Sequence, residues 1–193
     1  PGSTHPLLTP SLPPRALAAV ALMASLTAAG AFIKIPLPYV PITLQVTFVC
    51  LAGIWLGPTR GALSQLVYLT TGLIGFPIFA RGGGPHYLLE PSFGYLLGFP
   101  LAALTIGLLT RHSPSYNRCL LAIGAGLGLI YLLGVTYLYL NLRHVVGQEI
   151  SLTNACRLGL TPLPKDLALS PLIALIARRV RSRRTDFRTD SDT

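Results

Sequence analysis

Long stretches without a charged residue dominate this chain, and short segments that carry the charges separate them. Stretches free of Asp, Glu, Lys and Arg cover residues 16–33, 35–59, 61–80, 91–110 and 119–142. A sixth stretch, residues 158–177, is uncharged except for Lys165 and Asp166. A helix needs about 20 residues to cross roughly 30 Å of hydrocarbon, so each stretch can hold one span. The pattern predicts an all-α integral membrane protein, a compact bundle of six transmembrane helices.

The composition supports this class. Charged residues make up 11% of the 193 residues, against about 25% in an average soluble domain. Hydrophobic residues reach 51%, which excludes a disordered chain. Too few charges remain to cover a water-facing surface, so a soluble globular domain is also disfavoured.

The positions of the basic residues predict the orientation. If the N-terminus is inside, 10 of the 15 Lys and Arg residues lie on the cytoplasmic side. This positive-inside bias predicts six spans with both termini in the cytoplasm. We expect a multi-pass protein of the inner (cytoplasmic) cell membrane. We expect a disordered cytoplasmic leader at 1–14, the six-helix domain at 15–180 and a basic cytoplasmic tail at 181–193. The tail directly follows an apolar helix, which favours contact with anionic lipid headgroups over nucleic-acid binding.

A proline-rich segment interrupts the second stretch. Pro36, Pro38 and Pro41 lie so close together that the backbone there cannot be helical. The second helix is therefore expected at about 44–56, which is short for a lone span. Irregular backbone at membrane depth must line a cavity or be buried in protein.

A glycine triplet, Gly82, Gly83 and Gly84, follows the third stretch on the expected outer side. Glycine permits backbone conformations and close approaches that a Cβ would prevent. The triplet is either a flexible exposed loop or a loop that covers a ligand and offers backbone N–H groups. It is not a phosphate loop, because the GxxxxGK[ST] pattern is absent. Small residues at four-residue spacing, as in Gly94 and Gly98, are expected to pack helices within the bundle.

Lys165 and Asp166 lie near the start of the sixth helix. A charge at membrane depth defaults to a functional candidate. The alternative is a Lys–Asp pair that caps the helix at the interface. The three cysteines and four histidines show no metal-ligand spacing, and no catalytic dyad is visible. We therefore expect no cofactor and no enzyme activity.

Several short motifs occur in one order along the chain. They are PITLQ ending at Gln45, LGP ending at Pro58, GALSQ at 61–65, IGFPIFA at 74–80, the glycine triplet, PSFGYLLGF at 91–99 and LPKD ending at Asp166. This series closely resembles the BioY family, the biotin-specific substrate-capture (S) components of energy-coupling factor (ECF) vitamin transporters. The resemblance covers roughly residues 16–180 and is most specific at 41–99.

The resemblance implies a protein that binds biotin on the outer side and has no ATPase of its own. It also implies a transmembrane T component and two ATPase subunits as partners in a lipid bilayer. Small residues of the first helix contact the T component in this family, and Ala21 and Ser25 match them. No covalent chemistry is required of such a subunit.

The family's site residues carry over position by position. Gly82, Gly83 and Gly84 match the loop that contacts the vitamin, and Asp166 matches the residue that contacts the ureido ring. Some relatives bind the biotin carboxylate with an arginine after the tyrosine of the fourth helix, where this chain has Leu96.

Burying the carboxylate of the ligand without a partner costs free energy. We therefore expect Arg81, Lys165 or Lys34 to bind this carboxylate in place of the missing arginine, with Arg81 preferred.

Aromatic residues are expected to cover the biotin ring, among them Tyr87 and Tyr95, with Tyr39 and Phe79 as further candidates. Gln45, which closes the first motif, completes the expected substrate-binding set. Three other functions stay open. One is an S component for another vitamin, because site residues depart from the family pattern. Another is a small membrane-embedded enzyme, which would need acid/base groups or a metal motif that the sequence lacks. The third is a structural or assembly factor, which would not need the glycine triplet or Asp166.

Overall fold

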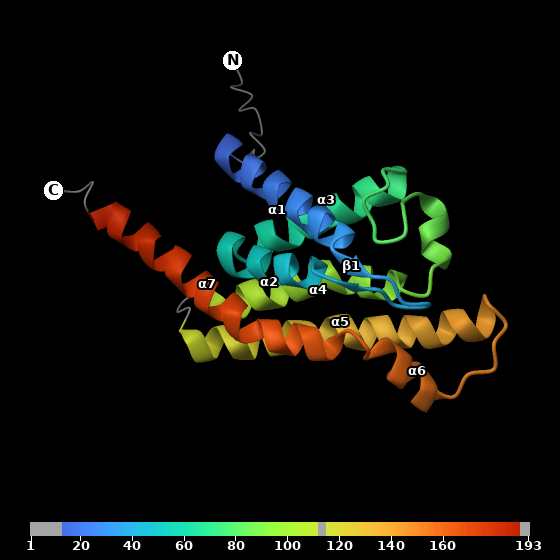
Figure 1. The fold of residues 1–193 in the computed structure, drawn as a ribbon. Helices are drawn as coiled ribbons and strands as arrows, with labels where there is room; N and C mark the ends of the chain where they lie inside the picture. The colour runs from blue at the N-terminus through green and yellow to red at the C-terminus, as the bar shows by residue number, and fades with distance from the viewer. Residues whose placement is uncertain (1–12, 112–114, 190–193) are drawn as a thin grey trace, which may run out of the picture.

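Seven α-helices, one 3₁₀ helix and one two-stranded hairpin form the described part of the chain, residues 13–111 and 115–189 of a computed structural model (Figure 1). The elements in chain order are α1 (Pro14–Phe32), β1 (Lys34–Ile35), β2 (Ile42–Thr43), α2 (Gln45–Leu56), α3 (Pro58–Ile74), η1 (Pro85–Leu89), α4 (Phe93–Thr110), α5 (Tyr116–His144), α6 (Leu152–Gly159) and α7 (Leu163–Thr189). The start of α1 and the end of α7 lie towards one side of Figure 1, whereas η1 and α6 lie towards the other.

Helix α4 is the centre of the bundle, between α5 on one side and α2 and α3 on the other. Glycines allow α4 and α5 to approach closely. A Cβ on Gly94 would lie 2.2 Å from the Tyr137 Cβ, and a Cβ on Gly98 would lie 2.8 Å from the Ile130 Cα. The prediction that these small residues pack helices within the bundle is confirmed.

The irregular segment between α1 and α2 is confirmed. Its two ends pair as the antiparallel hairpin of β1 and β2, in which Lys34 lies opposite Thr43. Helix α2 begins at Gln45 and has only 12 residues, so it is about 18 Å long. The prolines lie in the loop that joins the two strands, where no ladder N–H is needed.

Two helical segments differ from the uncharged stretches that predicted them. Helix α3 stops at Ile74, close to the expected end at Phe76 and Pro77 and before the uncharged stretch ends at residue 80, because Gly75 has a φ of 127° and Pro77 follows soon after. The sixth expected span is two helices, α6 and α7, bent by 42° at the break. Pro162 and Pro164 lack the N–H groups that a continuous helix would use there.

Helix α7 continues to Thr189, beyond the boundary at 180 that we expected for the membrane domain. Residues 1–12 of the expected leader and residues 190–193 of the expected tail lie outside the described part of the chain. The proposed division into leader, membrane domain and tail therefore stays a prediction.

Three helices in the described residues, α1, α4 and α5, are long and apolar enough to cross a membrane, and the bent pair α6–α7 would be a fourth. Helices α2 and α3, with 12 and 17 residues, are shorter. Large apolar side chains point outward over the bundle, for example Ile74, Leu121 and Leu132, which are 77%, 75% and 65% exposed. A surface with so many exposed apolar side chains is that of a membrane protein.

Candidate functional site

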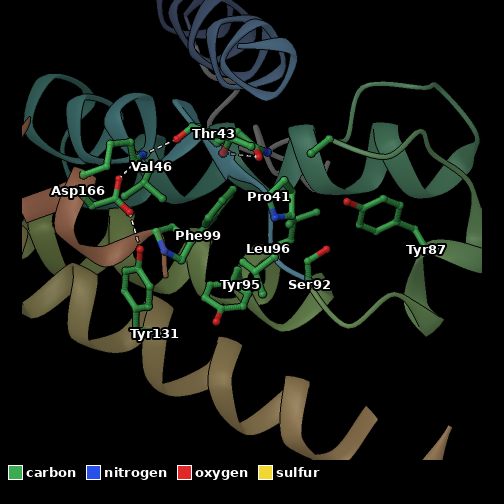
Figure 2. Close-up of a pocket in the computed structure, with 15 residues that line it drawn as sticks. Pro41, Thr43, Val46, Tyr87, Ser92, Tyr95, Leu96, Phe99, Tyr131 and Asp166 are labelled. Atoms are coloured by element: carbon green, nitrogen blue, oxygen red, sulfur yellow. Dashed lines mark hydrogen bonds and ion pairs between the residues drawn. The ribbon is translucent and has the colours of Figure 1, made fainter. Parts of the chain in front are cut away.

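A cavity lies between the loop before α2 and helices α2, α4, α5 and α7 (Figure 2). Its walls are mainly apolar and aromatic, with five polar side chains among them: Thr43, Gln45, Ser92, Lys165 and Asp166. The cavity measures about 40 Å³, room for a few water molecules. A vitamin-sized ligand therefore requires the lining side chains to move apart.

Asp166, from the first turn of α7, is the buried carboxylate of this cavity. The residue is 2% exposed, and the Tyr131 hydroxyl donates to its Oδ2 at 2.6 Å. The Lys165 ammonium forms an ion pair with Oδ1. Oδ1 accepts no hydrogen bond of ordinary geometry from the described residues. Since a carboxylate offers about four acceptor positions, Asp166 retains capacity for a ligand N–H.

Lys165 also donates to the backbone carbonyl of Thr43, at the end of β2. One ammonium group therefore ties α7 both to its own carboxylate and to the hairpin loop. Of the three cations expected as carboxylate partners, Lys165 lines the cavity, whereas Arg81 and Lys34 are not among the lining residues.

Arg81 instead fastens the hairpin loop from outside the cavity. Its Nη2 donates to the Leu37 carbonyl at 2.5 Å and to the Pro38 carbonyl. Its Nη1 forms an ion pair with Glu90 at 3.4 Å. Lys34 donates to the carbonyl of Ala80. The structure therefore does not bring the preferred carboxylate partner into the cavity.

The glycine triplet folds back onto α3. Gly82 exchanges two backbone hydrogen bonds with Phe79, and the Gly84 N–H donates to the Gly72 carbonyl at 2.7 Å. A Cβ on Gly83 would lie 2.0 Å from the Phe76 carbonyl oxygen. None of the three glycines is among the cavity-lining residues. Their contact with a ligand stays a prediction.

Of the four aromatic residues expected to cover the ring, Tyr87 and Tyr95 line the cavity, whereas Tyr39 and Phe79 are not among the lining residues. Tyr87 is 1% exposed, and its ring centroid lies 4.6 Å from that of Phe79. The Tyr95 ring packs edge-on against Tyr131 at 5.6 Å, and its hydroxyl donates to the Gly159 carbonyl at 2.7 Å. Tyr95 therefore joins α4 to the end of α6 and supports the tyrosine that holds Asp166.

Gln45 lines the cavity, but its side chain is already engaged. Its Nε2 donates to the Tyr68 hydroxyl at 2.6 Å, and its Oε1 accepts from the Thr43 hydroxyl at 2.9 Å. The amide therefore holds α2, α3 and the hairpin together at the cavity wall.

Tyr131 and Ser92 are among the cavity residues that the sequence reasoning missed. Tyr131 is a polar aromatic residue in the middle of the apolar stretch 119–142, and that position was a usable signal. Ser92 precedes Tyr95, Leu96 and Phe99 at helical spacing, so all four share one face of α4. That spacing could have placed Ser92 with its neighbours.

Ala21 and Ser25 lie on the exposed side of α1, away from the buried Val20, Met23 and Ala24. The Ser25 hydroxyl donates to the Ala21 carbonyl at 3.0 Å, so it is satisfied within its own helix. This surface of α1 is open to another protein or to lipid.

Comparison with known proteins now decides the family. The sequence profile of the BioY family matches residues 5–186 of the chain. The chain belongs to the BioY family. Membership makes it a transporter subunit rather than an enzyme.

Relatives in this family carry biotin transport in their names. The chain is 46% identical over 167 residues to a probable biotin transporter BioY of Lysinibacillus sphaericus, covering 85% of each chain. It is 40% identical over 169 residues to the biotin transporter BioY of Thermotoga maritima, covering 86% of this chain and 96% of that one. A crystal structure of the S component for biotin from an ECF-type ABC transporter matches with a TM-score of 0.76 and 26% identity, covering 87% of this chain and 91% of that one.

Proposed function

We propose that this chain is the biotin-capturing S component of an ECF transporter. The observation that carries the proposal is the nearly inaccessible Asp166 carboxylate, held by Tyr131 and Lys165 in an otherwise apolar and aromatic cavity. The BioY relatives, named as biotin transporters, support the same ligand.

The chemistry of biotin suits this cavity. Its ureido ring carries two N–H donors, and the Asp166 carboxylate can accept from them in charge-assisted hydrogen bonds. Leu96, Phe99 and Tyr95 offer apolar and aromatic surface for the thiophane ring and the tail. An ion pair with Lys165 is the contact expected of an ionised carboxylate, which acts only as an acceptor.

The wider arrangement belongs to the same proposal. Six transmembrane helices with both termini in the cytoplasm place the chain in the inner cell membrane, with α2 and α3 crossing as short spans aided by the irregular backbone beside them. The position of the start of α1 and the end of α7 towards one side of the bundle supports this topology. A T component and two ATPase subunits supply the energy for transport. Nucleic acid is not a partner.

Binding of labelled biotin to the purified full chain in lipid nanodiscs tests the ligand. We expect saturable binding at one site per chain, with displacement by unlabelled biotin and none by riboflavin or thiamine at the same concentration. Displacement by another vitamin, with no binding of biotin, would assign the chain to a different substrate. Absence of biotin binding would overturn the proposal.

A further inference from the structure

A second hollow, here called the outer groove, lies between the hairpin loop, the loop after α5 and helix α6, towards the end of the bundle away from the start of α1 (Figure 1). It measures about 470 Å³, within the range of about 300–1,000 Å³ that is typical of small-molecule sites. The cavity beside Asp166 measures about 40 Å³. Unlike the cavity, the outer groove has room for a vitamin-sized ligand as it stands. The residues of its lining on which the inference depends are Tyr39, Gln148, Glu149, Ile150, Arg157 and Leu158.

The outer groove and the cavity share two segments of the chain. In the hairpin loop, Tyr39 lines the groove and the next residue, Val40, lines the cavity. At the end of α6, Leu158 lines the groove, and Pro162 of the junction with α7 lines the cavity. The groove therefore lies directly outside the cavity. A ligand that moves the hairpin loop away from the α6–α7 junction passes from one into the other.

A single side-chain bond joins the hairpin loop to the loop after α5 in the described residues. The Tyr39 hydroxyl donates to Oε1 of Gln148 at 3.1 Å. Tyr39 is partly exposed and Gln148 is exposed. A neutral hydrogen bond of this kind contributes about 0.5–1.5 kcal/mol, so thermal motion breaks it often. The boundary above the groove is therefore weak.

Arg157 is the cation of the outer groove. Its side chain is exposed and makes no ion pair or hydrogen bond within the described residues. The other four basic residues expected on the outer side already bond to a carbonyl, hydroxyl or carboxylate; they are Lys34, Arg81, Arg143 and Lys165. A guanidinium offers five N–H donors and attracts an anion through water before the two groups touch.

We infer that the outer groove is an entry site for biotin, where Arg157 binds the ligand carboxylate before the ligand passes into the cavity. The inference rests on the proposed function and adds a step that precedes capture at Asp166. Tyr39, Ile150 and Leu158 offer apolar surface for the ring and the tail. Because Arg157 does not line the cavity, the ligand leaves it on entering. Arg157 therefore sets the rates of association and dissociation and not the final affinity.

Glu149 lines the same groove and has the opposite charge. It is exposed and forms no ion pair within the described residues. Its carboxylate repels the carboxylate of the approaching ligand. The entry site therefore predicts effects of opposite sign: loss of the Arg157 charge slows association, and loss of the Glu149 charge speeds it.

The test measures the association and dissociation rates of tritiated biotin and tritiated biotin methyl ester, with the full chain in phosphatidylcholine nanodiscs. At about 0.01 M salt, Arg157→Gln should slow biotin association about 3- to 10-fold, and at about 1 M salt less than 2-fold, because the Debye length falls from about 30 Å to about 3 Å. Dissociation should slow by the same factor, so that the Kd is unchanged. Association of the uncharged ester should not change.

Three further variants separate charge from other effects. Arg157→Lys keeps the charge and should retain the native rate and its salt dependence. Glu149→Gln should speed biotin association about 2- to 5-fold at low salt and leave the Kd unchanged. Arg60→Gln is the matched control, because Arg60 is an exposed arginine at the start of α3, on the expected cytoplasmic side. It should leave both rates as they are.

Unchanged biotin association in Arg157→Gln, or equal slowing for the ester, would overturn the entry site while leaving biotin capture intact. Faster dissociation with unchanged association would place Arg157 in the final complex and would overturn it as well. Failure of the native chain to bind biotin would instead overturn the proposed function on which the entry site rests.

Discussion

Asp166 illustrates how a carboxylate can persist inside an apolar bundle. Removing an ion from water costs several kcal/mol unless partners replace the water. Asp166 has two partners of different kinds, the Tyr131 hydroxyl and the Lys165 ammonium. Because these do not fill all the acceptor positions of the carboxylate, the residue is stable in the free protein and still able to receive ligand donors.

Replacing this carboxylate should therefore damage binding far more than folding. Asp166→Asn keeps the size of the side chain and an acceptor for Tyr131, but it removes the charge. Losing one partner of a desolvated charged hydrogen bond costs about 2–5 kcal/mol, so biotin affinity should fall about 30-fold or more. Calorimetric titration of the purified chain measures this change.

Glu149→Gln is the control for the loss of one negative charge, because Glu149 lies on the exposed loop after α5. It should bind biotin normally. If Asp166→Asn also binds normally, Asp166 does not contact the ureido group.

Gly83 makes a different residue-scale prediction. Because a Cβ there would lie 2.0 Å from the Phe76 carbonyl oxygen, Gly83→Val should strain the loop and destabilise the ligand-free protein by about 1–3 kcal/mol. Gly124→Val is the matched control, since a Cβ on Gly124 meets no atom within 4 Å. Thermal melting without biotin measures both. Equal melting temperatures for the two variants would contradict the tight packing of this loop.

The sequence could identify some site residues and not others, for physical reasons. Asp166 stood out because a charge in an apolar stretch is costly and needs a function or a partner. Arg81 does not line the cavity, because closeness in sequence to the glycine triplet does not say where a long side chain points. Its contact with the ligand carboxylate stays a prediction. Ser92 carries no charge, and a serine before a helix is ordinarily a cap. Only its helical spacing to Tyr95, Leu96 and Phe99 could have placed it at the cavity wall.

At the scale of elements, the hairpin loop before α2 depends on side chains from elsewhere in the chain. Arg81 binds two of its carbonyls, Lys165 binds the carbonyl of Thr43, and the Tyr39 hydroxyl donates to Gln148 at 3.1 Å. Val40 and Pro41 of this loop line the cavity. These bonds therefore hold one wall of the site in place.

Arg81→Ala should remove the bonds that hold this wall in place but no direct contact with the ligand. The guanidinium is about one-third exposed, so we expect a loss of stability of about 1–2 kcal/mol rather than the full value of a buried charged group. The binding of biotin and the binding of its methyl ester should weaken by the same factor, because Arg81 is not among the cavity-lining residues. Thermal melting and titration with both ligands measure these effects.

Arg143→Ala is the control, because Arg143 is an exposed arginine whose side chain bonds to Tyr139 of its own helix. A selective loss for biotin over the ester in Arg81→Ala would return Arg81 to the role of carboxylate partner.

The break between α6 and α7 shows what charge spacing alone does not reveal. Counting charges merged residues 158–177 into one span, whereas Pro162 and Pro164 remove two backbone donors in the middle of the junction. Tyr95 then binds the carbonyl of Gly159 at the end of α6. The bend places Asp166 in the first turn of α7, where it accepts a hydrogen bond from Tyr131. A single straight helix over residues 158–177 did not predict this hydrogen bond.

At the scale of the whole molecule, the helical membrane class followed from composition and from apolar stretches about 20 residues long. Composition and stretch length describe the whole chain, so an error at one helix boundary does not change the predicted class. The number of spans is more sensitive, because α2 and α3 are short and their crossing depends on the irregular backbone beside them. The partner is hardest to predict from one chain, because an exposed apolar helix face can contact either lipid or another protein.

The last prediction concerns that face on α1, where Ala21 and Ser25 are exposed. Small residues let a partner helix approach closely in a membrane, so Ala21→Trp should prevent assembly with the T component and its ATPases. Leu121→Trp is the matched control, because Leu121 is 75% exposed on α5 and should tolerate tryptophan in lipid. Co-purification of a tagged S component with its co-expressed partners measures assembly. The Ala21→Trp chain alone should still bind biotin, because α1 contributes no side chain to the cavity lining. Normal assembly of this variant would place the docking surface on another helix.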